Sequence, residues 1–317
     1  RTYRKGASLI MKNKILSLLL TAILLVGSAS LLIACGDKVD KSDETTAADS
    51  GAPADSGTAE DSKDVIDYTF DFNGSDFKYT GTPEHETSGT SLIFKKSGTY
   101  KLSGTLSDGT IVVDIPKEER LTLLLDNFTA SCSTSAVIYV KSADRVYIDL
   151  KKGTVNTLTD ASSYVYETAG ETKPNACIYA ADDLTIKGGG TLIVNANYNN
   201  GIGCKNDIVI KNGAVTVKAI NNAIKGNNSV TVQGDAQVNI LACDDAIKSD
   251  SLKTGKGFIL ITEDAVVNLT ADSDGLQASQ SVTVSGNAKI TYTVGGEAVK
   301  CDGTSSIADG SMTPAAK

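Results

Sequence analysis

The stretch NGIGCKNDIVIKNG at residues 200–213, with AVTVKA after it at 214–219, decides the fold because both parts come back further along the chain. NAIKGNNSVTVQG at 222–234 and AQVNIL at 236–241 repeat the same order of residue types. Each unit begins with a polar, a small and an aliphatic residue, reaches a second aliphatic pair, turns at glycine and ends in a third apolar stretch. This alternation predicts three short β-strands per unit.

The units recur with a nearly constant period. Their aliphatic markers are, in order, Ile178, Ile202, Ile224, Ile247, Leu276 and Val299. The markers are 24, 22, 23, 29 and 23 residues apart, and the long spacing contains the insertion LKTGKG at 252–257. Leucine-rich repeats share this period but need Leu and Asn at fixed places, which are absent here, and the many β-branched, Gly and Asn residues argue against helices. The sequence therefore predicts an all-β solenoid, a parallel β-helix with three strands and about 23 residues per coil.

The boundaries of the repeat region suggest how the rest of the domain is organised. Weaker versions of the pattern occur upstream, in TIVVDI, LTLLLDN, AVIYVK and RVYIDL. We expect a β-helix domain at 65–303, in which 66–100 form a cap or first coil because the ends of a solenoid must be covered. Residues 154–174 are expected to be a loop inserted into one coil, and 304–317 a tail.

The N-terminal segment resembles the signal of a bacterial lipoprotein. Two lysines follow Met11, an apolar run comes next, and LIAC at 32–35 looks like a lipobox. The apolar run is short and broken by small residues, so a cleaved signal fits it better than a transmembrane helix. Residues 1–34 are therefore predicted to be a signal peptide, with 1–10 upstream of the start, and Cys35 to be lipidated.

Composition and charge restrict the classes of molecule that the protein can bind. Residues 35–64 have almost no large apolar side chains, which predicts a disordered acidic tether between a lipid-anchored Cys35 and the domain, on the extracellular face of the cell membrane. The chain has 30 Lys and Arg against 38 Asp and Glu, and removing the first 34 residues removes five basic groups, leaving 25 against 38. This balance argues against nucleic acid as a partner and suits a protein that binds cations.

The five cysteines beyond the lipobox lack zinc-like spacing and are expected to be buried thiols. The protein is expected to be a monomer.

Stacking of the coils predicts a column of oxygen-bearing side chains. Equivalent residues of successive coils lie about 4.8 Å apart. The residues before the small position of each unit are Asn199 and Asn200, Asn221 and Asn222, Asp244 and Asp245, Ser273 and Asp274, and Gly296 and Glu297. Neighbouring carboxylates repel unless a cation lies between them, and calcium prefers oxygen ligands. The candidate calcium ligands are Asp244, Asp245, Asp272, Asp274 and Asn222. The alternative is that these residues are there because Asn and Asp suit turns.

A second column follows two places after the small residue, and it contains Gly203, Lys225, Lys248, Gln277 and Lys300. Because the aliphatic markers should point inward, these side chains should point outward. They should lie near the column of Asn, Asp and Glu residues from Asn199 to Glu297, which we call the acidic edge. One interpretation is a solvated lysine row that pairs with the acids. The other is a binding surface on which Lys225, Lys248, Gln277 and Lys300, with a bridging calcium ion, hold a polysaccharide that carries regularly spaced carboxylates, such as a polyuronate.

These motifs resemble a known family. DDAIKSD at 244–250, its relatives NAIKG and DGLQAS, and ADDLTIKGGGTLIV at 181–194 are similar to the carbohydrate-binding domains of secreted lipoproteins from Gram-positive anaerobes. The resemblance, over roughly 65–303, implies a right-handed parallel β-helix similar in fold to family 9 pectate lyases. It also implies binding of calcium and of acidic or cellulosic polysaccharides, with Asp244 and Asp245 as calcium ligands. Relatives often have Gly where this chain has Ala246.

Three functions remain open at this point: a non-catalytic binding protein, a calcium-dependent polysaccharide lyase, and a structural spacer or adhesin. A lyase needs a base, for which Lys248 or Lys225 are the candidates, and a cationic residue for the uronate. The chain has no Arg from residue 175 onward, which favours binding without catalysis, and no catalytic residue is predicted. The absence of Trp favours a charged glycan over a neutral one.

Overall fold

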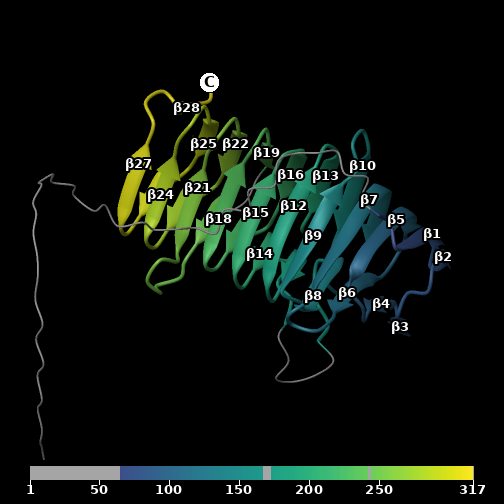
Figure 1. Cartoon of the computed structure of the whole chain (residues 1–317). Coiled ribbons are helices and arrows are strands. Elements are labelled where there is room, and N and C mark those ends of the chain that lie inside the picture. The colour runs from purple at the N-terminus through teal and green to yellow at the C-terminus, as the bar shows by residue number, and fades with distance from the viewer. Residues whose placement is uncertain (1–64, 167–172, 242–243, 317) are drawn as a thin grey trace, which may run out of the picture. The chain divides into compact units, whose positions relative to one another are not determined.

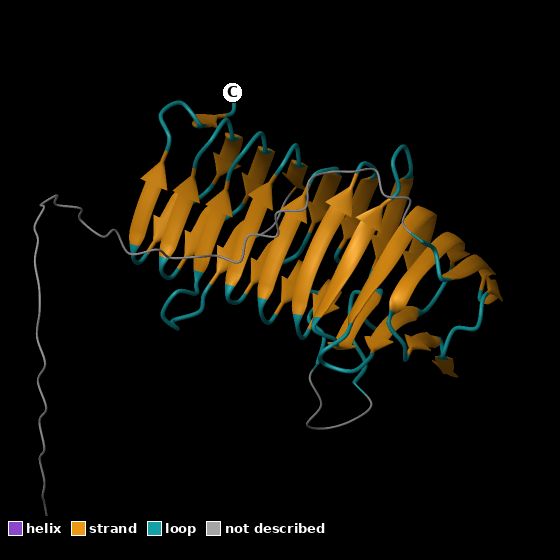
Figure 2. Ribbon diagram, in the orientation of Figure 1, coloured by secondary structure: helices purple, strands orange, loops and turns teal. Residues whose placement is uncertain are grey.

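The computed structural model describes residues 65–166, 173–241 and 244–316, all within the compact unit Asp61–Lys317. In these ranges the regular elements are strands and no helix is present (Figures 1 and 2), so the predicted all-β class is confirmed. The predicted signal peptide, the lipidated Cys35 and the tether lie outside the described residues. The described part of the chain contains no helix that is long and apolar enough to span a membrane.

Most strands form three columns, because every strand from β11 onward pairs in parallel with the strand three places later. The first column contains β4 (Ser91–Phe94), β6 (Thr110–Asp114), β8 (Ile138–Ser142), β11 (Ala176–Ala180), β14 (Asn200–Cys204), β17 (Ile224–Gly226), β20 (Ile247–Ser249), β23 (Leu276–Ala278) and β26 (Val299–Cys301). The second contains β9 (Arg145–Leu150), β12 (Asp183–Gly188), β15 (Asp207–Lys211), β18 (Ser229–Gln233), β21 (Phe258–Ile261), β24 (Ser281–Val284) and β27 (Thr304–Ile307). The third contains β10 (Val155–Thr159), β13 (Thr191–Asn195), β16 (Ala214–Lys218), β19 (Gln237–Leu241), β22 (Val266–Ala271), β25 (Lys289–Val294) and β28 (Met312–Pro314).

The N-terminal strands start the columns and close that end. They are β1 (Tyr68–Gly74), β2 (Asp76–Thr80), β3 (His85–Ser88), β5 (Gly98–Leu106) and β7 (Arg120–Ser131). The long strand β7 pairs with β9 and with β10, so the second and third columns both begin from it. At the edge, β2 pairs antiparallel with β1, and β3 with β4. The end is packed with fully buried rings, including Phe70, Phe94 and Tyr100.

The register follows the aliphatic markers. Ile202 pairs with Ile224, and Ile224 with Ile247, and all three side chains are fully buried. Burial of such a side chain stabilises the fold by about 1.5–3 kcal/mol. A shift of one residue would turn every marker outward, so the core fixes the register. The same register places the next residues, Lys225 and Lys248, on the outer face of the first column.

Two expectations about segments are wrong. Residues 304–317 are not a tail throughout, because β27 and β28 extend the second and third columns by pairing with β24 and β25. Residues 154–174 are not a loop throughout, because β10 lies between β7 and β13. Both segments are polar and show little apolar alternation, so the sequence pattern did not mark them as strands. Backbone hydrogen bonds to the neighbouring strands nevertheless hold them in the sheet. Of the cysteines beyond the lipobox, Cys243 lies outside the described residues, and the other four are free thiols, three of them buried.

Candidate functional site

The acidic edge has the predicted vertical order. The backbone N–H of Asp244 donates to the carbonyl of Asn221 at 2.9 Å, and that of Ser273 donates to the carbonyl of Asp244 at 2.7 Å. The next backbone bonds follow the same order: the N–H of Ala223 donates to the carbonyl of Asp245, and the N–H of Ala246 donates to the carbonyl of Asp274. Residues one repeat apart, 22–23 positions or 28–29 across the insertion, are therefore direct neighbours at the entrance to the first column.

The amide part of this edge is held by side-chain hydrogen bonds. Asn222 Nδ2 donates to Asn200 Oδ1 at 2.8 Å, and Asn200 Nδ2 donates to the carbonyl of Asn175 at 3.1 Å. The amide chain ends at Asn222, whose Oδ1 is buried and has no hydrogen-bond partner in the described structure. A buried acceptor without a partner costs about 1–3 kcal/mol, so this oxygen is a place where a cation or water would be stabilised.

The carboxylate part is neutralised by lysines. Asp245 and Asp274 are each 4% exposed. In each, Oδ1 accepts a backbone N–H of the next unit: Asp274 N–H to Asp245 at 3.2 Å, and Glu297 N–H to Asp274 at 2.9 Å. In each, Oδ2 accepts a lysine: Lys248 at 3.0 Å and Lys300 at 2.9 Å. The repulsion that suggested a shared calcium ion is thus already relieved at these two residues.

The pKa of Asp274 records this balance. Burial acts to raise it, but the hydrogen bonds from Lys300 and from the Glu297 backbone, with the charges of Lys300 and Lys248, outweigh burial and lower the pKa below its ordinary value. Correspondingly, the hydrogen bond to Asp274 raises the pKa of Lys300. Both groups are therefore charged at neutral pH.

The other predicted calcium ligands are arranged differently. Asp244 and Asp272 are exposed. No group of three or more His, Cys, Asp or Glu side chains in the described ranges is placed to hold a metal ion. Asp244, Asp245 and Asn222 carry carboxylate and amide oxygens, the kinds of ligand that calcium accepts.

The lysine column also has the predicted order. Strand pairing sets Gly203 beside Lys225, Lys225 beside Lys248, and Gln277 between Lys248 and Lys300. Towards the N-terminus the column continues through Tyr179 and Tyr139, whose ring centroids lie 6.0 Å apart. In order, this face of the first column therefore carries two tyrosines, of which Tyr179 is buried, then the glycine gap, and then Lys225, Lys248, Gln277 and Lys300.

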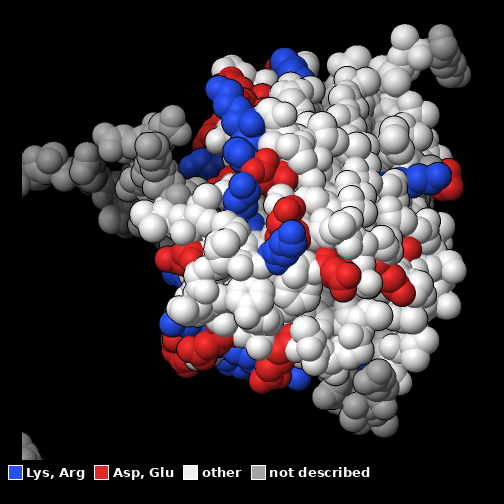
Figure 3. Space-filling view, turned by 90° about the vertical axis from the view of Figure 1, so that its right-hand side faces the viewer, with Lys and Arg blue, Asp and Glu red and all other residues white. Residues whose placement is uncertain are grey.

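Each lysine of this column is ion-paired. Lys225 contacts Asp250 at 2.7 Å, in addition to the two pairs of Lys248 and Lys300. Between them, Gln277 Oε1 is buried without a hydrogen-bond partner in the described structure. Lys225 or Lys248 would have to leave its ion pair before it could act as the base of a lyase. Figure 3 shows basic and acidic side chains lying next to each other. Among the ion pairs of the N-terminal coils is that of Lys101 with Asp126, at 3.0 Å.

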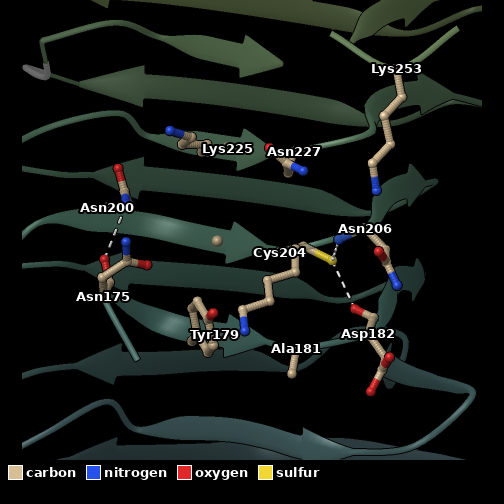
Figure 4. Close-up of a pocket in the computed structure, with 12 residues that line it drawn as sticks. Asn175, Tyr179, Ala181, Asp182, Asn200, Cys204, Asn206, Lys225, Asn227 and Lys253 are labelled. Atoms are coloured by element: carbon tan, nitrogen blue, oxygen red, sulfur yellow. Dashed lines mark hydrogen bonds between the residues drawn. The ribbon is translucent and has the colours of Figure 1, made fainter. Parts of the chain in front are cut away.

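A hollow of about 570 Å³ opens at the glycine gap (Figure 4). It is lined by Asn175, Tyr179, Ala181, Asp182, Asn200, Gly203, Cys204, Lys205, Asn206, Lys225, Asn227 and Lys253. Three lysines and one aspartate line it, and one of these lysines, Lys225, is paired with Asp250. Burial raises the pKa of Tyr179 and that of Cys204 to about 12 each, so the phenol and the thiol both stay protonated at neutral pH.

Comparison with known proteins agrees with this picture. The sequence model of the family described as "Carbohydrate-binding domain-containing protein" matches residues 88–316. The chain belongs to this family. A protein of the same description from Acetivibrio thermocellus is 40% identical over 217 residues, which make up 68% of this chain and 75% of the relative. A solved structure, titled "polysaccharide lyase-like protein from C. thermocellum, Gadolinium derivative", is 40% identical, covers 79% of this chain and 100% of its own, and has a TM-score of 0.75.

The match to the carbohydrate-binding domain family extends beyond residue 303, where the sequence placed the end of the domain, and so includes β27 and β28. Sequence reasoning identified Lys225 but missed three other contributors to the hollow: Tyr179, Lys205 and Lys253. The signal for Tyr179 was available, since it precedes Gly203 in the same column. Lys253 lies in the insertion that interrupts the period. It has no equivalent residue in the other coils, so stacking of the coils does not predict its position.

Proposed function

We propose that this member of the carbohydrate-binding domain family is a right-handed parallel β-helix that binds an acidic polysaccharide, such as a polyuronate, without cleaving it. The observation that carries the proposal is the outward column of Lys225, Lys248, Gln277 and Lys300 on consecutive strands. Strand spacing of about 4.8 Å sets Lys225 beside Lys248, and the neutral Gln277 separates Lys248 from Lys300, so the row carries three positive charges along four strands. A polysaccharide with carboxylates at regular intervals matches such a row.

The existing ion pairs do not prevent this binding. A lysine ammonium has three N–H donors. Its contact with Asp245, Asp250 or Asp274 uses one of them, and the lysine side chains remain 23–46% exposed. The carboxylates on the protein hold the ammonium groups in place, which lowers the entropy lost when a glycan binds.

Calcium is part of the proposal. Asp244, Asp245 and Asn222 would hold the ion, and Asp272 and Asp274 stand at the same edge. The support is the unpartnered Asn222 Oδ1, with Asp244 and Asp245 in the next coil hydrogen-bonded through their backbones to Asn221 and Ala223. The gadolinium derivative of the solved relative adds to it, since gadolinium is also a hard cation that prefers oxygen ligands. When bound, calcium supplies positive charge through which the acidic edge and a uronate could be joined.

The N-terminal segment completes the proposal. Its lipobox-like LIAC supports a lipid anchor at Cys35, which would hold the domain on the outer face of the cell membrane. Metabolic labelling with a fatty-acid analogue tests this, because the label should be lost in Cys35→Ser.

A lyase is the second candidate, favoured by the "polysaccharide lyase-like" title of the solved relative. Lys248 or Lys225 would then be the base, although both are engaged in ion pairs with carboxylates. Calorimetric titration of the protein with polygalacturonate and with cellulose, with and without a chelator, separates the candidates when unsaturated product is followed by ultraviolet absorbance. Heat of binding without product supports the proposal. Product that disappears in Lys248→Ala supports the lyase, and no binding to either glycan refutes both.

A further inference from the structure

We propose that the insertion at 252–257 makes the hollow over Gly203 a subsite for one anionic sugar residue, with Lys253 as the residue that determines specificity for the charge. This inference rests on the proposed function, because it names where an acidic polysaccharide is recognised most specifically. The lysine column alone would bind a chain anywhere along its length. The hollow would fix one sugar of that chain in place.

The hollow exists because Gly203 has no side chain. A Cβ atom there would lie 2.9 Å from Ala176 Cβ and 3.6 Å from the ring of Tyr179. Neighbouring positions in the column carry Tyr179 and Lys225, so the gap is bounded by a ring on one side and an ammonium on the other. A side chain at residue 203 would fill the space that a ligand needs.

The insertion reaches this gap from further along the chain. It follows β20, yet Lys256 contacts Asp207 at 3.4 Å, at the start of β15, which pairs with β18 and belongs to an earlier unit. The backbone N–H of Gly257 donates to the carbonyl of Asn228. These contacts anchor the insertion beside the hollow, and the side chain of Lys253 extends from the upper right of Figure 4 toward Asn206.

The chemistry of the lining matches a sugar that carries a carboxylate. Lys205, Lys225 and Lys253 face one lining acid, Asp182, and Lys225 is also paired with Asp250. In the described ranges no carboxylate lies within ion-pair distance of Lys253, which is exposed. Its charge is thus available to a ligand, and an unpaired cation beside a concave surface attracts anions.

Amide groups supply the remaining contacts for a sugar. Asn175, Asn206 and Asn227 line the hollow, as does Asn200, whose buried amide is already hydrogen-bonded to Asn175 and Asn222. An amide both donates and accepts hydrogen bonds, as a sugar hydroxyl does. Tyr179 adds one more hydrogen-bond donor, since its phenol stays protonated. A pyranose with one carboxylate would therefore find partners for its hydroxyls and for its charge in the same place.

The test is calorimetric titration of the protein with trigalacturonate and with its fully methyl-esterified form, which keeps the shape and removes the charge. Lys253→Ala should weaken trigalacturonate binding about tenfold, the loss of one charge-assisted hydrogen bond, and leave binding of the ester unchanged. The matched control is Lys218→Ala, which removes an equal charge from an exposed position on β16 and should change neither. Melting temperatures should not differ among the three proteins.

The outcomes separate the subsite from the proposed function. If Lys253→Ala binds trigalacturonate as tightly as the wild type, the subsite is overturned and the proposed function stands. If the wild type binds no polysaccharide, the proposed function is overturned. In that case titration with sodium galacturonate, followed by NMR of the lysine side chains, decides the subsite. A shift of the Lys253 signal that is absent for Lys218 supports it, and no shift overturns it.

Discussion

Removal of the Asp274 carboxylate tests whether the carboxylates of the acidic edge stabilise the fold and hold the lysine column in place. In Asp274→Ala the Glu297 N–H loses its acceptor at 2.9 Å and Lys300 loses its partner at 2.9 Å. A hydrogen bond to a charged group contributes about 1.5–3 kcal/mol. The pair with Lys300 adds little to this, because that lysine side chain is 46% exposed and solvent screens the pair. The free energy of unfolding should therefore fall by about 2–3 kcal/mol.

Urea denaturation at pH 7, in a chelating buffer, measures this loss. The matched control is Asp272→Ala, which removes the same charge two residues away from an exposed position and should cost less than about 0.5 kcal/mol. Equal effects of the two substitutions would refute the structural role of Asp274. So would an effect of Asp274→Ala that is seen only when calcium is added, since the carboxylate would then act as a metal ligand.

The pH dependence gives an independent check on the same residue. The pKa of Asp274 is lowered in the folded protein, so its contribution is complete above the unfolded pKa of about 3.9 and is lost as the pH falls through the folded value. The pKa of Lys300 is raised, so its contribution is complete below its unfolded pKa of about 10.4 and is lost only at higher pH. The difference in stability between the wild type and Asp274→Ala should be constant from about pH 6 to 9 and should shrink below about pH 4. A difference that changes near pH 7 would mean that another group dominates.

Further outcomes can be checked on the same purified protein. Ile247→Ala should lower the free energy of unfolding by about 2–5 kcal/mol in urea, because the side chain is fully buried, and a smaller loss would question the packing of the first column. Asp244→Ala should weaken calcium binding in calorimetry without lowering stability in chelator, and unchanged calcium binding would remove Asp244 from the proposed site. Cys177, buried and with its pKa raised by burial, should resist a thiol reagent until the protein unfolds, whereas the partly exposed Cys301 should react in the native state. Rapid native labelling of Cys177 would contradict its position in the core.

The vertical order of the site could be predicted because a solenoid converts a period in sequence into a distance in space. Once Ile224 and Ile247 are paired inside, Lys225 and Lys248 must be neighbours outside. The same rule placed Asp245 next to Asp274. Strand pairing depends on backbone hydrogen bonds and core packing, and both leave a clear trace in the pattern of apolar residues.

The partners of each charge could not be predicted in the same way. The sequence left open whether the lysines pair with the acids, and the structure shows three such pairs, because long side chains reach any carboxylate nearby. The position of Lys253 depends on the path of an insertion that has no counterpart in the other units. Strands β27 and β28 were missed because TSSI and its surroundings lack the apolar alternation that marks the other strands.

The most direct test of the proposed binding surface is calorimetric titration of the wild type and of Lys225→Ala with polygalacturonate. Lys225 belongs both to the lysine column and to the hollow, and its partner Asp250 is 38% exposed, so its loss leaves no buried charge unpaired. We predict saturable binding by the wild type, weakened about tenfold or more in Lys225→Ala at an unchanged melting temperature. Equal affinity of the two proteins, or no binding by the wild type, would contradict the proposal.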